Sequence, residues 1–102
     1  MIKYFFSGMF LFNGVPHLVK GITGEKHMTP FKRVSSAHLN IVWAFVNFVF
    51  GILILGFDPL TARVNWPTGA NIWVFLAGGF AIGLTAAQLF GNPNARLPWH
   101  KN

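Results

Sequence analysis

The charged residues of this chain are confined to short segments that separate three long apolar stretches. No Asp, Glu, Lys or Arg occurs in residues 4–19, 34–57 or 64–95, which are rich in Phe, Leu, Ile, Val, Ala and Gly. A helix needs about 20 predominantly apolar residues to cross the hydrocarbon core of a bilayer. The pattern therefore predicts an all-α integral membrane protein, a single transmembrane domain over residues 1–102 with three helices at about 4–21, 38–57 and 70–90.

The first span requires its helix to continue through a proline. The uninterrupted apolar run ends at Val15, and a helix of about 12 residues covers only about 18 Å. We therefore expect the helix to continue to about Gly21. It should be kinked at Pro16, because proline removes a backbone donor and clashes with the preceding turn. A connection over residues 22–37 follows.

Residues that favour helix ends bound the second and third spans. Ser35 or Ser36 is a suitable N-cap for the second span, and Gly56 is expected to end it. Thr68 is expected to cap the third span, and Gly91 to end it.

The distribution of basic residues predicts how the chain is oriented in the membrane. With three spans, Lys3 and Arg63 lie on the side of the N-terminus, whereas six basic residues lie on the other side: Lys20, Lys26, Lys32, Arg33, Arg96 and Lys101. Because Lys and Arg accumulate in cytoplasmic connections, we expect the N-terminus outside, the C-terminus inside, and the 22–37 connection in the cytoplasm.

Composition excludes several kinds of chemistry. The chain of 102 residues has no Cys, so it can form neither disulfides nor thiolate metal sites. Its two acidic residues, Glu25 and Asp58, are expected on opposite sides of the membrane, which argues against paired-carboxylate catalysis and against an enzyme. The net charge of +6 comes from residues that flank apolar spans, so it indicates membrane topology and no nucleic-acid partner.

Asparagines in the first two spans need polar partners. Asn40 and Asn47 are seven residues apart and share a helix face with Ala44 and Gly51, and Asn13 lies in the first span. A carboxamide that faces lipid leaves its donors and acceptors unpaired, which is costly. These three side chains are therefore expected either to bond between helices or to form a polar lining for a solute, ion or headgroup.

Two histidines border the 22–37 connection. His17 ends the first span, and His38 begins the second. Neutral imidazoles can ligate a metal or haem iron or relay protons, so both are candidate metal ligands. No pair of histidines has helical ligand spacing, however, and interfacial histidines with local hydrogen bonds are the simpler interpretation. We expect no cofactor.

Small residues recur in the third span. Gly79, Gly83 and Ala87 are four residues apart and share one helix face. Small residues allow the backbones of membrane helices to approach closely. They are expected to form a helix-packing seam, either within the chain or between chains.

Several short motifs support a resemblance to a known group. They are Phe12 to His17 (Phe-Asn-Gly-Val-Pro-His), Gly21-x-x-Gly24, Thr29-Pro30-Phe31, Ser35-Ser36 and Asn40-x-x-Trp43. In these features, over roughly residues 10–50, the chain resembles a group of small bacterial inner-membrane proteins with about three predicted helices and no assigned activity. The resemblance implies a multi-pass protein of the bacterial inner (cytoplasmic) membrane and implies no substrate.

Three classes of function are consistent with these features. The first is an accessory subunit or self-associating helical module, in a homo-oligomer or a larger membrane complex. The second is a small oligomeric transporter or channel with a lining of Asn13, His17, Asn40 and Asn47. The third is a haem- or metal-binding membrane protein that uses His17 and His38. In all three, the lipid bilayer is a partner.

Overall fold

The computed structural model describes residues 1–32 and 34–91 of the chain. Three helices, α1 (Ile2–Ile22), α2 (Ala37–Leu55) and α3 (Asn71–Phe90), account for most of the described residues. Between α2 and α3, β1 (Phe57–Asp58) and β2 (Arg63–Val64) form a small antiparallel hairpin. The fold is thus mostly helical with three helices, as expected. Two of them, α2 and α3, are long and apolar enough to cross a membrane.

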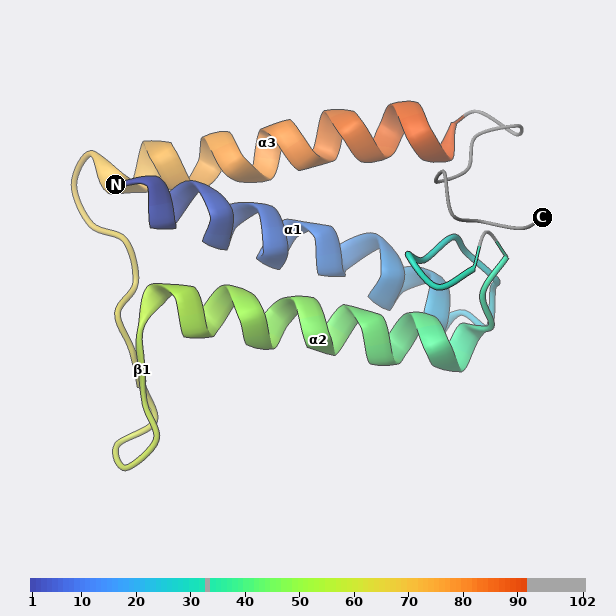
Figure 1. Cartoon of the computed structure of the whole chain (residues 1–102), viewed down its shortest axis with the longest axis horizontal. Coiled ribbons are helices and arrows are strands. Elements are labelled where there is room, and N and C mark those ends of the chain that lie inside the picture. Colours follow the sequence, from blue (N-terminus) through green and yellow to red (C-terminus); the bar gives the residue numbers. More distant parts are fainter. Residues whose placement is uncertain (33, 92–102) are drawn as a thin grey trace.

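Helix α1 lies between the other two helices (Figure 1). Helix α2 runs antiparallel to α1, whereas α3 runs parallel to it. The N-terminus and the β-hairpin lie at one end of the bundle, and the loop formed by residues 23–36 lies at the other end with the C-terminal end of α3. Among the described residues, α2 and α3 make few direct contacts with each other, so α1 holds the bundle together.

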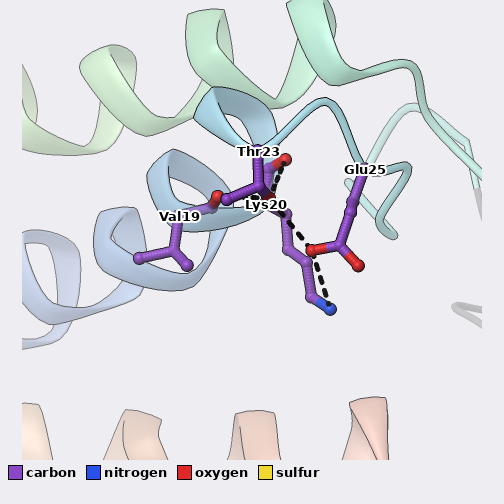
Figure 2. Close-up of polar contacts among 4 residues, drawn as sticks. All are labelled: Val19, Lys20, Thr23 and Glu25. Carbon is purple, nitrogen blue, oxygen red and sulfur yellow. Dashed lines mark hydrogen bonds and ion pairs between the residues drawn. The ribbon is translucent and has the colours of Figure 1, made fainter.

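Helix α1 ends in a polar cap formed by its own last turn and the residues that follow. Thr23 Oγ1 lies 2.9 Å from Val19 O, 3.0 Å from Lys20 O and 2.9 Å from Glu25 Oε2, so its single proton is shared among three acceptors. Glu25 also lies 3.7 Å from Lys20 Nζ (Figure 2). Both partners of this ion pair are well exposed, so the pair contributes little to stability.

Helix α2 is bounded as the sequence indicates, whereas α3 begins differently. Ser36 caps α2 by accepting a hydrogen bond from Leu39 N at 3.1 Å, and Gly56 ends α2 with a φ of 105° that favours glycine. The predicted cap of α3 is wrong, because Ala70 occupies the N-cap position and no side chain caps the helix. Thr68 lies two residues before the N-cap position, and its backbone carbonyl, not its hydroxyl, accepts a hydrogen bond from Asn71 N.

Polar side chains fill the interior, and large apolar side chains cover the outside. The fully or nearly fully buried polar residues are Ser7, His17, Thr29, Ser35, Asn40 and Asn47. In the described part of the chain, the buried apolar side chains are those of Met28, Ala44 and Leu55. Many Phe, Val, Leu, Ile and Trp side chains on all three helices are exposed. A water-soluble domain shows the opposite distribution.

The contact between α1 and α2 is a series of matched small residues. They recur every seventh position along both helices and face each other in three pairs: Ser7 with Gly51, Gly14 with Ala44, and Gly21 with Ala37. Ser7 Oγ donates to Gly51 O at 2.8 Å. A Cβ atom added to Gly14 would lie 3.0 Å from Ala44 O, and one added to Gly21 would lie 2.9 Å from Ala37 O. We call this contact the α1–α2 seam.

The contact between α1 and α3 is close over only part of its length. Gly8 lies against the Phe75 carbonyl, and Gly78 lies against the Phe5 carbonyl, so neither position has room for a Cβ atom. Gly79 packs against the ring of Phe12.

The predicted helix-packing seam of Gly79, Gly83 and Ala87 is therefore formed only in part within the chain. Only Gly79 takes part, because nothing lies within 4 Å of a Cβ built on Gly83, and Ala87 is exposed. Gly78, which the four-residue spacing does not include, makes the closest contact with α1.

We expect Gly78→Ala to lower the free energy of unfolding by about 1–3 kcal/mol, because the added methyl group forces α3 away from the Phe5 carbonyl. The matched control is Gly83→Ala, which has open space and gains up to about 1 kcal/mol from helix propensity. Equilibrium unfolding in detergent micelles measures both. Equal effects of the two substitutions would contradict the described α1–α3 contact.

Candidate functional site

A cavity of about 510 Å³ lies between α1 and α3 near the end of the bundle that carries the 23–36 loop. We call it the α1–α3 cavity. Its wall is mostly apolar, with three polar side chains, and consists of Phe12, Asn13, Pro16, Lys20, His27, Ile82, Gly83, Ala86, Ala87, Phe90 and Gly91. Two smaller cavities, of about 100 and 110 Å³, are lined in part by Trp43. Asn13 lines all three.

The 23–36 loop folds back on itself and so brings His27 to the cavity. His27 and Ser35 exchange backbone hydrogen bonds of 3.1 and 3.0 Å. The Thr29 and Ser35 hydroxyl oxygens lie 2.7 Å apart. Because Ser35 Oγ gives its one proton to Lys32 O at 3.0 Å, Thr29 is the donor of this pair. The two buried hydroxyls thus join the two arms of the loop.

Asn40 connects this loop to α1 and α2. Its Nδ2 lies 3.0 Å from His27 O, 3.2 Å from Ser35 O and 3.0 Å from Ser36 O. Three carbonyl acceptors fix the orientation of the amide, so Oδ1 is the atom that faces His17 Nδ1 at 2.8 Å. An amide oxygen only accepts, so His17 carries its proton on Nδ1, and the Nε2 of neutral His17 keeps a lone pair.

Asn13 and Asn47 form a second polar link between α1 and α2. Asn47 Nδ2 donates to Trp43 O at 2.8 Å, which fixes that amide and makes Asn47 Oδ1 the acceptor for Asn13 Nδ2 at 3.0 Å. Asn13 Oδ1 then accepts no hydrogen bond from any described residue, while Asn13 lines the cavities. The asparagines predicted from the sequence thus act first as links between helices, and Asn13 also serves as lining.

Three aromatic rings meet where α1, the loop and α3 converge. The His27 ring centroid lies 4.0 Å from that of Phe90 and 5.3 Å from that of His17. His27 Nε2 and Trp43 Nε1 are buried and have no hydrogen-bond partner among the described residues. Burial lowers the pKa of His27 to about 4, assisted by the nearby charges of His17 and Lys20 and opposed by that of Glu25. His27 is therefore neutral at pH 7.

The two predicted metal ligands are not brought together. The imidazole beside His17 is that of His27, whereas His38 is exposed on the first turn of α2. No group of three or more His, Cys, Asp or Glu suited to a metal occurs within residues 1–32 and 34–91. His100, Arg33, Arg96 and Lys101 lie outside the described residues. The sequence analysis missed Lys20, His27 and Trp43 as site residues, because only the folded loop and the helix rotation place them there.

Comparisons with known proteins supply no family for the chain. No protein-family model matches it, and no curated protein or solved structure was found to be similar to it.

We expect Asn40→Ala to lower the free energy of unfolding by about 2 kcal/mol, because it removes the bond to His17 and leaves loop carbonyls without their donor. The amide protons of His27 and Ser35 should then exchange faster with solvent. Hydrogen exchange followed by NMR measures this. Gln88→Ala removes an exposed carboxamide from α3 and serves as the control. Unchanged exchange at His27 and Ser35 in Asn40→Ala would contradict the anchoring role of Asn40.

Protection of the loop amides should fall as the pH falls from about 6.5 towards about 4. The pKa of His27 is lower in the folded chain than its ordinary value of 6.5, so the unfolded loop binds more protons in this window. The folded loop is therefore most stable above pH 6.5, where His27 is neutral in both states, and it loses stability as the pH falls and His27 becomes protonated. Hydrogen exchange between pH 4 and pH 7 measures the effect. His27→Gln should flatten the profile, and His38→Gln, at an exposed position, should leave it unchanged. An unaltered profile in His27→Gln would rule out His27 as the titrating group.

Proposed function

We propose that this protein spans the bacterial inner membrane three times and uses the α1–α3 cavity to bind a small amphiphilic molecule taken from the bilayer. The insertion of α2 and α3 is supported by their length and apolarity. Helix α1 is more polar, but His17 and Ser7 are buried, whereas Phe6, Val15 and Val19 remain exposed. Its outward surface is thus compatible with lipid, and its 21 residues extend over about 31 Å.

The orientation with the N-terminus outside and the C-terminus inside is supported by the separation of basic residues. Lys3 and Arg63 lie at the end of the bundle with the N-terminus and the hairpin, and Lys20, Lys26 and Lys32 lie at the other end. The cavity opens near this second, more basic end, which the positive-inside rule assigns to the cytoplasm.

One observation carries the proposal of binding. The α1–α3 cavity combines apolar walls from Phe12, Ile82 and Phe90 with a buried, unpaired polar atom, His27 Nε2. A buried polar atom without a partner is costly. A ligand with an apolar body and a polar end matches the apolar walls and the polar side chains of Lys20 and His27, and it satisfies Nε2 once the His27 ring turns towards the cavity. The bilayer supplies such molecules at high concentration.

A second candidate function is that of an accessory or self-associating helical subunit. It is favoured by the small residues of α3 that make no close contact within the chain, namely Ala77, Gly83 and Ala87, which are exposed. Such residues suit a neighbouring membrane helix. A small oligomeric transporter or channel stays a prediction, and it would need further copies, because α2 and α3 make few direct contacts among the described residues.

We expect Gly83→Leu to fill the cavity and to abolish retention of the amphiphile without loss of folding. Nothing lies within 4 Å of a Cβ on Gly83, so the larger side chain enters the cavity without a backbone clash. Native mass spectrometry of the chain released from bilayer nanodiscs measures the retained molecules.

The matched control is Ala77→Leu, which adds a leucine side chain at an exposed position of α3 that does not line the cavity. It should retain the same molecules as the original chain. Identical retention in Gly83→Leu and Ala77→Leu would refute the proposed binding site.

A further inference from the structure

The α1–α3 cavity is electrostatically asymmetric along its length. Its apolar part, with Phe12 and Ile82, lies towards the middle of the bundle, and Lys20 and His27 lie towards the end of α1. From Phe12 to Lys20, α1 rises by about 12 Å. This is the arrangement that an amphiphile needs when its polar head lies at the membrane interface and its chain in the hydrocarbon.

Lys20 is placed to contact the head of such a molecule. Figure 2 shows its side chain leaving α1 towards α3, drawn as the faint orange ribbon, and Lys20 lines the cavity. Its described ionic partner is Glu25, at 3.7 Å, with side chains that are 40% and 57% exposed. An exposed pair of this length is weak, so a second anion can share or replace Glu25 at the ammonium group.

His27 supplies a neutral donor at the same end. His27 lines the cavity, and its Nε2 is unpaired but covered by protein atoms, so the ring must turn for Nε2 to reach a molecule in the cavity. In the tautomer protonated on Nε2, the neutral ring donates one hydrogen bond to an oxygen acceptor. A phosphate oxygen is such an acceptor, and hydrogen bonds to charged oxygens are stronger than those to neutral ones.

The surroundings of this end also favour an anion. Lys26 and Lys32 lie in the 23–36 loop with Lys20 next to it, and Glu25 is the one acidic residue in this region. A basic cluster at the cytoplasmic interface attracts anionic headgroups.

We propose that the α1–α3 cavity binds an anionic phospholipid, with its phosphate between Lys20 and His27 and an acyl chain along Phe12 and Ile82. This inference rests on the proposed function and names the chemical class of its amphiphile.

The test is a competition measured by native mass spectrometry on the delipidated full-length chain. Phosphatidylglycerol and phosphatidylcholine with identical acyl chains are added in equal amounts. The original chain should prefer phosphatidylglycerol, and Lys20→Gln should lower this preference about fivefold, the effect of one lysine near an anionic surface. Lys26→Gln removes an equal charge from an exposed position outside the cavity and should keep the preference. Equal preferences in Lys20→Gln and Lys26→Gln would overturn the proposal.

Two further arms separate the possible outcomes. If Gly83→Leu loses lipid while Lys20→Gln keeps the preference, the proposed binding function stands and the anionic class is wrong. If soluble glycerol phosphate displaces the lipid at equal concentration, the site recognises free phosphate, which also overturns the proposal.

A readout on the original chain does not depend on the folding of any variant. Phosphatidylglycerol should raise the pKa of His27, followed by NMR of the ring, because a nearby negative charge favours the imidazolium form. Phosphatidylcholine should leave this pKa lower, because its zwitterionic headgroup binds the site less well. Equal pKa values in the two lipids would contradict selective binding of the anionic lipid beside His27.

Discussion

The structure depends on the close antiparallel approach of α1 and α2. Between helices in lipid there is little hydrophobic drive, so packing and polar bonds must supply the association. Matched small residues, such as Gly14 against Ala44, let the backbones approach. That approach brings His17 within 2.8 Å of Asn40 and Asn13 within 3.0 Å of Asn47. Asn40 in turn binds three carbonyls of the loop and its end, so the position of His27 at the cavity follows from the α1–α2 seam.

Helix α3 is attached differently, and the cavity is a consequence. Its contact with α1 is closest at Gly8 and Gly78, where neither helix has a side chain to separate the backbones. Further along, Gly83 has open space around it, and a volume of about 510 Å³ remains between the helices. The proposed binding of a molecule from the bilayer requires one loosely packed side, and α3 provides it, while the α1–α2 seam keeps the polar groups in fixed orientations.

The residues that α2 contributes to the α1–α2 seam can mostly be predicted from the sequence, but the residues that pack against them cannot. The spacing of Asn40, Ala44, Asn47 and Gly51 places them on one face, and all four are buried. Helix bounds near Gly56 and Gly91 also follow from local chemistry. Which face of α3 meets α1 depends on its rotation, so the spacing of Gly79, Gly83 and Ala87 does not show that Gly78 makes the closest contact with α1 and that Gly83 makes none. His27 was missed because its place depends on a loop whose fold is set by side-chain bonds to distant residues.

The most direct test of the account is a set of NMR cross-relaxation measurements between lipid and protein in nanodiscs that contain anionic phospholipid. The account predicts contacts from acyl-chain protons to the Gly83 amide and the Phe12 ring, inside the α1–α3 cavity, and contacts from headgroup protons to the His27 ring. Water contacts at Gly83 and Phe12, with no acyl-chain contacts there, would contradict it.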